Sequence, residues 1–503
     1  MRAAIVRMGA LALAGCGDAH VLVTVTARAT VSEVRSLDVT VRDADDEAGS
    51  RFELTPAAAL PQTFVVATDG RSGTITIAAL ARDRAGVLVG LGQTSALVGG
   101  QTAATLRLDP ADVAINARVA GDQDLVPLIR AAHGGQNVAA APDGGFVALF
   151  EHSPAVAGRR FGPGGRPSIN ATSLNALDFE LDGVTLDEIA ATPAIAAGPG
   201  GFVAAWERPV DGLTATRAWV AVLDAEAGTT SAPVALAADD GVARRFPRVT
   251  AIDGGWVATW QQPSDPFDEY QGELRARRLD ATGAPIGAEI VVAAGATGHH
   301  DPQVAALAGG FAVVWEEAIA TRSEIHLRRF DAVGAALGPV QPLVTTGLPA
   351  APRLVATTDG LALVYFDFAG AGGNPWWLVR LGVDGAPRGA PIEVARTDTL
   401  PDGGRVEHSA LATGAAGELA ITWTMFSSDG LDADVWLRAF TADGAPCGDA
   451  AIVNSTRVGF QELPSVARFG SDAFVVVWDD ASGVAPDSSG GGVRGRVVYP
   501  CAP

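Results

Sequence analysis

Short apolar segments that end in an aromatic residue recur along the C-terminal three-quarters of the chain. Copies of one design occupy residues 146–150, 202–206, 256–260 and 311–315, and three further copies follow. The closing aromatics lie 56, 54, 55, 50, 58 and 55 residues apart, at Phe150, Trp206, Trp260, Trp315, Tyr365, Trp423 and Trp478. A glycine-bearing turn comes just before each copy, which indicates a strand that follows a tight turn.

Each repeat contains four predicted strands. One strand precedes the glycine turn and often opens with proline, a third follows the aromatic (residues 274–279 and 325–330), and a fourth follows another turn (residues 289–292). Four strands in about 55 residues are typical of a β-propeller blade, and no 3.6-residue periodicity indicates helical repeats. The sequence therefore predicts a seven-bladed β-propeller over residues 124–503.

The last repeat stops after its third strand, at residues 493–499. Residues 124–129 lie just ahead of the first repeat, and Val126 precedes Val138 by 12 residues, close to the 13 residues between Val291 and Val304. We therefore predict that residues 124–129 supply the fourth strand of the last blade and close the ring. Residues 111–123 are then a linker.

Residues 16–110 are predicted to form a small β-sandwich, because short alternating segments are separated by turn residues. The segments are residues 21–26, 37–41, 63–66, 73–77, 87–89 and 104–108. This region resembles the immunoglobulin-like or transthyretin-like modules of bacterial lipoproteins. Asp43, Asp45, Asp46 and Glu47 cluster in one turn and suggest Ca²⁺ binding, although a solvated acidic turn explains them as well.

Residues 1–15 have the features of a secretory signal: Arg2 and Arg7 flank the start of a short apolar run that ends at Cys16. Residues 13–16, Leu-Ala-Gly-Cys, resemble the lipobox of bacterial lipoproteins. The resemblance implies cleavage before Cys16 and acylation of that cysteine, for example with palmitate, which would anchor the body to the cell membrane or outer membrane, facing the periplasm or exterior. The alternative is an ordinary secretory signal with a chance cysteine.

Composition narrows the function classes. The chain has 503 residues and 51.2 kDa, with 48% hydrophobic and 18% charged residues, a composition that allows a sizeable core and argues against general disorder. Its net charge is -21, and all 36 basic residues are arginine. Such an acidic chain is a poor electrostatic partner for nucleic acid.

The repeated aromatics are predicted to pack between blades. Adjacent Trp376 and Trp377 are expected to point to opposite faces of one strand. Acidic residues gather after the aromatics and in the predicted loops, and Glu151 and Glu207 occupy the same place as several of them. This pattern predicts a ligand or cation face, or simply a soluble surface; its residues are Asp265, Asp268, Glu269, Glu316, Asp367, Asp479 and Asp480.

Histidine and cysteine add two further hypotheses. His299 and His300 lie in a predicted blade-to-blade loop beside Asp301, but adjacent histidines seldom reach one metal ion, so no metal ligand is assigned. Cys447 and Cys501 follow the third strands of the last two repeats and would emerge on the same face of neighbouring blades. A disulfide between them is possible outside the cytoplasm.

No known catalytic motif is present, and no catalytic residue is assigned. The units, of the type Pro-x-Val-Ala…Gly-Gly-Phe-x-Val-x-Trp over residues 124–500, loosely resemble repeats of extracellular bacterial proteins, a resemblance that implies no activity. We predict a cell-envelope lipoprotein that binds or scaffolds an envelope protein or glycan through its acidic loop face. The alternatives are a glycan-directed hydrolase or lyase that uses carboxylates of the propeller face and a purely structural spacer.

Overall fold

The computed structural model describes most of the chain: residues 6–7, 20–28, 30–31, 34–43, 47–54, 60–68, 73–84, 88–98, 103–116, 123–124, 136–152, 155–163, 165, 179–181, 191–210, 215–230, 232–238, 240–265, 268–295, 297–319, 322–368, 374–397, 406–484 and 491–501. No α-helix occurs within these ranges. A search of the same ranges accordingly finds no helix that could span a membrane. The chain divides into two compact units near Val113.

The first unit contains an eight-stranded sheet in the order β1-β5-β2-β8-β7-β6-β3-β4. Most of its strands were predicted, because their apolar residues alternate and face the core. Their bounds are β1 (Val6–Arg7), β2 (His20–Ala27), β3 (Ser36–Arg42), β4 (Glu47–Glu53), β5 (Gln62–Ala67), β6 (Thr74–Arg82), β7 (Leu88–Leu97) and β8 (Ala103–Pro110).

This sheet folds over on itself around one core. Strands β7 and β8 share only the pairs Gly90↔Pro110 and Leu91↔Asp109, so the sheet is weakly joined there. Val23 and Leu106 from one half and Val39 and Ile77 from the other belong to the same buried cluster. The two halves therefore pack face to face as a small β-sandwich.

Strand β4 was not predicted, because its polar, glycine-containing sequence has no clear alternation and it lies at the sheet edge. Glu47 begins β4 and pairs with Arg42, so the acidic turn connects a hairpin. Asp45, Asp46 and Cys16 lie outside the described residues. Calcium binding and lipidation therefore stay predictions.

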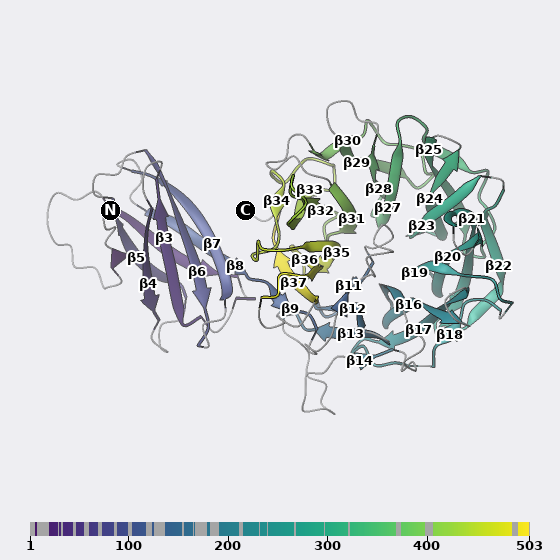
Figure 1. The fold of residues 1–503 in the computed structure, drawn as a ribbon, viewed down its shortest axis with the longest axis horizontal. Coiled ribbons are helices and arrows are strands. Elements are labelled where there is room, and N and C mark those ends of the chain that lie inside the picture. The colour runs from purple at the N-terminus through teal and green to yellow at the C-terminus, as the bar shows by residue number, and fades with distance from the viewer. Residues whose placement is uncertain are drawn as a thin grey trace. The chain divides into compact units, whose positions relative to one another are not determined.

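The second unit is a ring of seven sheets, as predicted (Figure 1). In Figure 1, β19, β23, β27 and β31 lie toward the middle of the ring, and β14, β18 and β22 lie outside. Each blade runs from an inner to an outer strand. The strands are, in blade 1, β10 (Gln123–Asp124), β11 (Val138–Ala140), β12 (Phe146–His152), β13 (Ala155–Phe161) and β14 (Phe179–Glu180); in blade 2, β15 (Ala191–Gly198), β16 (Gly201–Val210), β17 (Ala215–Asp224) and β18 (Val234–Ala235); in blade 3, β19 (Arg245–Ile252), β20 (Gly255–Asp265), β21 (Asp268–Asp280) and β22 (Pro285–Ala293); in blade 4, β23 (Gly298–Leu307), β24 (Gly310–Ile319), β25 (Arg322–Asp331) and β26 (Gln341–Val344); in blade 5, β27 (Pro349–Thr357), β28 (Gly360–Asp367), β29 (Pro375–Gly382) and β30 (Ile392–Arg396); in blade 6, β31 (Val406–Thr413), β32 (Leu419–Phe426), β33 (Ala433–Phe440) and β34 (Ala451–Ile452); and in blade 7, β35 (Gln461–Phe469), β36 (Ala473–Asp480), β37 (Gly492–Val498) and β9 (Val113–Ala114).

The ring closes through an N-terminal strand, but the predicted strand was the wrong one. The fourth strand of blade 7 is β9, which lies within the predicted linker, and the Ile115 amide donates to the Val493 carbonyl (2.8 Å). Asp124 instead pairs with Glu151 in blade 1, and residues 125–130 lie outside the described residues. A strand of two residues has no periodicity, so the sequence could not reveal β9.

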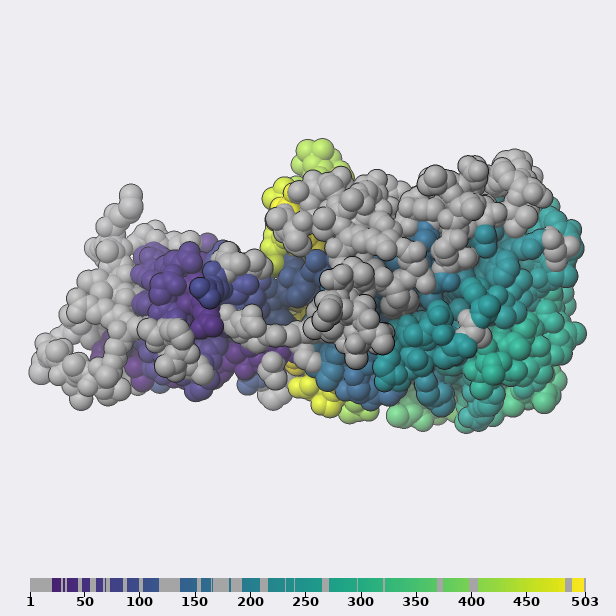
Figure 2. Space-filling view, turned by 90° about the horizontal axis from the view of Figure 1, so that it is seen from below, coloured from purple at the N-terminus to yellow at the C-terminus, as the bar shows by residue number. Residues whose placement is uncertain are grey.

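Aromatic side chains fill the spaces between blades, as predicted. Trp206, Trp260, Trp315, Trp423 and Trp478 are 0% exposed, and five of the buried clusters each combine residues of two consecutive blades. Trp376 is buried and Trp377 only half-buried, in agreement with the expected alternation. In Figure 2 the middle blades, teal to green, form a continuous packed surface.

Arginines join neighbouring blades at the outer rim. Four blades have an arginine at the same place on their third strand, where it pairs with the second-strand residue that lies two positions before the repeated aromatic. The guanidinium Nη1 of each donates to a backbone carbonyl of the preceding blade, in its outer strand or in the residue beside that strand. These rim arginines are Arg159 (to Ile115, 3.0 Å), Arg277 (to Leu236, 2.9 Å), Arg328 (to Val292, 2.9 Å) and Arg438 (to Val394, 2.8 Å). Three of them also lie 5.5–5.6 Å from a phenylalanine ring on their own strand.

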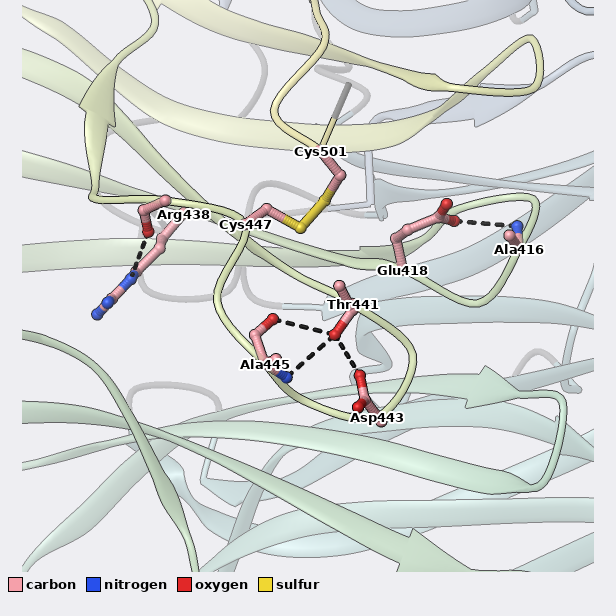
Figure 3. Close-up of a disulfide and its surroundings, with 9 residues drawn as sticks. Ala416, Glu418, Arg438, Thr441, Asp443, Ala445, Cys447 and Cys501 are labelled. Atoms are coloured by element: carbon pink, nitrogen blue, oxygen red, sulfur yellow. Dashed lines mark hydrogen bonds between the residues drawn. A yellow bond between two sulfur atoms is a disulfide. The ribbon is translucent and has the colours of Figure 1, made fainter. Parts of the chain in front are cut away.

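Cys447 and Cys501 form a disulfide with a Cα–Cα distance of 4.9 Å (Figure 3). Cys447 follows a tight turn in which the Ala445 amide donates to Thr441 Oγ1 (3.1 Å). The bond links blade 6 to the chain segment that leaves blade 7. It therefore fixes the C-terminal end of the ring covalently.

Candidate functional site

The innermost strands of blades 2 to 7 contain the same irregularity at the same place. One non-glycine residue in each has a positive φ of 50–56°, within a register shift of the ladder, and in five of the six a proline follows. These bulge residues are Thr192, Phe246, Asp301, Ala351, His408 and Leu463. A positive φ is strained for such residues, so the fold must compensate at each bulge.

The residue directly after the repeated aromatic supplies that compensation in several blades. The bulge amide of the next blade donates to a carboxylate in the pairs Thr192–Glu151 (2.7 Å), Phe246–Glu207 (2.7 Å) and Ala351–Glu316 (3.2 Å). We call Glu151, Glu207 and Glu316 the inner-ring carboxylates. A ring of carboxylates was predicted, but these three lie within the fold and join consecutive blades.

Polar side chains from successive inner strands meet at the propeller axis. Arg353 of blade 5 donates from Nη1 to Asp301 Oδ2 of blade 4 (2.7 Å) and from Nε to the Ser409 carbonyl of blade 6 (2.8 Å). Gln303 Nε2 donates to Asp301 Oδ1 (2.9 Å). Because these groups come from the innermost strand of three blades, their common meeting place is the axis of the ring.

Arg248 of blade 3 interacts with the charges of Asp301 and Arg353, and we call these three residues together with Gln303 the axial cluster. Arg248 is 3% exposed, and burial lowers the pKa of its guanidinium to about 10, with Asp301 acting against that decrease and Arg353 adding to it. The group is therefore a buried cation at neutral pH. Arg248 and Arg353 were not predicted as site residues, and the only signal was a charged residue directly after the inner-strand proline.

The surroundings of Glu316 change the acidity of its carboxyl group. Burial raises its pKa to about 8; the hydrogen bond from the Ala351 amide opposes this increase, and the Asp301 carboxylate adds to it. His300 Nε2 lies 3.5 Å from Glu316 Oε1. At neutral pH Glu316 is a protonated carboxyl beside an ionised one, an arrangement that can serve as a general acid.

A cluster of histidine and glutamate side chains lies on blade 4. His326 Nε2 bonds Glu324 Oε2 (2.8 Å), and His326 Nδ1 lies 2.9 Å from Glu317 Oε2. His299 Nδ1 bonds the Gly272 carbonyl (3.0 Å). A search of the described part of the chain finds no group of three or more His, Cys, Asp or Glu side chains that could hold a metal ion.

The remaining residues of the predicted face have different positions. Asp265 and Asp268 pair in the β20–β21 hairpin, but their side chains and that of Glu269 lie outside the described residues. Asp367 Oδ1 accepts the Leu348 amide (2.9 Å). Asp479 and Asp480 are 8% and 4% exposed, and Asp480 pairs with Arg494. These described carboxylates are therefore engaged in the fold.

The loop face, which contains the second-to-third-strand loops and the blade-to-blade loops, carries exposed apolar side chains that we did not predict. Leu431, Val458 and Val484 are 68%, 67% and 44% exposed, and we call them the loop-face patch. Their loops are joined: the Gly459 amide donates to Asp432 Oδ1 (2.8 Å), and the Ala481 amide donates to the Phe460 carbonyl (2.8 Å). The signal in the sequence that could have found this patch was the presence of these apolar residues in predicted loops.

Ser427 and Asp429 hold Leu431 outward in a tight turn. Ser427 Oγ donates to Asp429 Oδ1 (2.7 Å), and the Leu431 amide donates to the same oxygen (3.1 Å). The Ser427 hydroxyl is the main cause that lowers the pKa of Asp429, so this exposed carboxylate stays ionised. The exposed apolar side chain is thus presented by a hydrogen-bonded turn beside a negative charge.

No protein-family model matches the chain, and no curated protein matches it. Among solved structures, it is similar to an endo-arabinase from Bacteroides thetaiotaomicron (12% identity, 48% of this chain and 89% of that one, TM-score 0.32) and to the N10 neuraminidase-like protein of a bat influenza virus (8%, 67% and 97%, TM-score 0.41). A protein of unknown function from Dyadobacter fermentans has 12% identity, with 77% and 98% covered and a TM-score of 0.40. Likenesses this distant support no family or activity.

Proposed function

We propose that the chain is a binding or scaffolding lipoprotein of the cell envelope, anchored through Cys16, with the loop face of blades 6 and 7 as its contact surface. The loop-face patch is the observation that carries this proposal, because exposed apolar side chains grouped beside charges are a common feature of interaction sites. The charges beside the patch are the carboxylates of Asp429 and Asp432, which accept the Leu431 and Gly459 amides.

The anchor is tested by metabolic labelling of the full chain in a bacterial host with an alkyne analogue of palmitate. Label and membrane fractionation are expected for the wild type and lost in Cys16→Ser. A label that persists in this variant, or its absence from the wild type, overturns the anchor without affecting the contact surface.

The contact surface is tested by placing a photo-crosslinking amino acid at position 431 of the membrane-anchored chain. We expect discrete adducts with envelope components from position 431 and none from Val333, a 71% exposed residue of the opposite face. Leu431→Ser combined with Val458→Ser should abolish adducts from a probe at position 484, whereas Val333→Ser should not. Equal adducts from both faces, or none, contradict the proposal.

The axial carboxyls favour one second candidate, a glycan-directed hydrolase or lyase with Glu316 as its acid. A panel of soluble polysaccharides would be incubated with the full chain and assayed for new reducing ends or unsaturated products. Product formation that falls as pH rises through about 8, and is abolished by Glu316→Gln, supports catalysis. Glycan binding without products supports the binding role instead.

A further inference from the structure

The buried guanidinium of Arg248 has hydrogen-bonding capacity that the fold does not use. Nη1 donates to the carbonyl of Pro247 (3.0 Å), but Nε and Nη2 have no hydrogen-bond partner and no contact with solvent. These two nitrogens lie along one edge of the guanidinium plane. They form the fork with which arginine binds two oxygens of one carboxylate or phosphate.

A hydroxyl on the same face of the blade is also unused. Thr259 lies directly opposite Arg248 in the β19–β20 ladder, so the two side chains lie on the same face of the blade. Thr259 is 0% exposed, and its Oγ1 has no hydrogen-bond partner. Arg248 and Thr259 therefore place three unused donor groups on one face of the blade.

The neighbouring carboxylates do not accept hydrogen bonds from Arg248 Nε or Nη2. Asp301 and Glu207 act on the charge of Arg248 from a distance, but the hydrogen bonds that they accept come from Arg353 and Gln303 and from the Phe246 amide and the Thr192 hydroxyl. A buried cation with unpaired donors destabilises a fold unless an oppositely charged group joins it. The planar fork of Nε and Nη2 specifies a group with two acceptor oxygens.

We propose that Arg248 and Thr259 form an axial binding site for the carboxylate of a small organic acid. Two carboxylate oxygens receive the Nε and Nη2 protons, and the Thr259 hydroxyl donates to one of them. Because protein encloses both nitrogens, the ligand enters only when side chains at the axis move apart, so the site accepts small groups and binding is slow. The acid is either free or part of a sugar.

The full chain, purified in detergent, would be titrated with formate, acetate and glucuronate at constant ionic strength, with chloride, sulfate and glucose as controls. We expect at least one carboxylate to raise the Tm by a few degrees and to bind in calorimetry, whereas glucose does not. A larger Tm shift with glucuronate than with acetate indicates that the natural ligand is a sugar acid, and a larger shift with acetate indicates a free small acid. Both orders support the site.

Arg248→Met is the decisive variant. It removes the unpaired charge at similar volume, so we expect a higher Tm without ligand and no shift with carboxylate. Arg353→Met is the matched control: its guanidinium is paired, so its loss should lower the Tm. Thr259→Val should weaken carboxylate binding severalfold while leaving the fold intact.

Two results overturn the proposal. One is an equal Tm shift with chloride or sulfate, which indicates a general salt effect. The other is a wild type that responds to no carboxylate in Tm or calorimetry; an Arg248→Met variant less stable than the wild type then shows that the guanidinium is satisfied within the fold.

Discussion

Neighbouring blades are joined by opposite chemistry at the axis and at the rim. At the axis, inner-ring carboxylates accept backbone amides, and Glu207, the most enclosed of them, is 0% exposed. At the rim, arginines donate to backbone carbonyls, and Arg328 is only half-buried. Each contact fastens one blade to the next, so the two sets differ mainly in their access to water.

Access to water decides how much each contact contributes. A rim carbonyl that loses its arginine can bond water, whereas a bulge amide that loses its carboxylate stays buried and unpaired. The bulge residues are also strained, and their hydrogen bonds offset that strain. We therefore expect substitutions at the axis to destabilise the propeller far more than equivalent substitutions at the rim.

Glu207→Ala should have the largest effect, since it leaves both the Phe246 amide and the Thr192 hydroxyl without their acceptor. We expect a loss of about 4 kcal/mol in the free energy of unfolding, measured by urea denaturation. Glu207→Gln keeps an acceptor oxygen and should recover more than half of it. If the free energy of unfolding of Glu207→Ala lies within about 1 kcal/mol of the wild-type value, which is about the size of one hydrogen bond, the axial contacts are no stronger than the rim contacts.

The disulfide joins blade 6 covalently to the segment that leaves blade 7, in addition to the hydrogen bonds at the axis and the rim. It closes a loop with a sequence separation of 54 residues, so replacing Cys447 and Cys501 together by serine should cost on the order of 3 kcal/mol. The measurement is urea unfolding with and without a reducing agent. Reduction should lower the midpoint of the wild type and leave the double variant unchanged; an insensitive wild type would contradict the expected contribution.

The buried carboxyl of Glu316 makes the axis sensitive to pH. Its folded pKa of about 8 exceeds the ordinary 4.5, so folding favours the protonated form and its stabilising contribution is lost as pH rises toward 8. Between pH 6 and 8 we expect the wild type to lose about 2 kcal/mol of stability through this group. Glu316→Gln does not titrate and should have a flatter profile over that window; parallel profiles would contradict the burial effect.

The sequence predicted what repeats and missed what depends on contacts between blades. The aromatics recur at one spacing, so blade number and core followed from the pattern. The position of Glu207 after its aromatic was also visible, but its acceptor role depends on a bulge in another blade, where Phe246 has a positive φ. The closing strand β9 is too short to have a pattern, and the unused donors of Arg248 depend on its buried surroundings, which the sequence does not show.

The smallest expected effect is at the rim, in Arg328→Ala. Its Nη1 bonds the Val292 carbonyl and its guanidinium lies 5.6 Å from the Phe330 ring, but water can replace the lost hydrogen bond. We expect a loss of about 1 kcal/mol, only partly recovered by Arg328→Lys, which keeps the charge but loses the planar group that stacks on the ring. In the double variant with Glu207→Ala the two losses should add to within about 0.5 kcal/mol, because the sites share no partner. A larger coupling energy would mean that the axial and rim contacts stabilise the ring cooperatively. Access to water would then not explain their separate contributions.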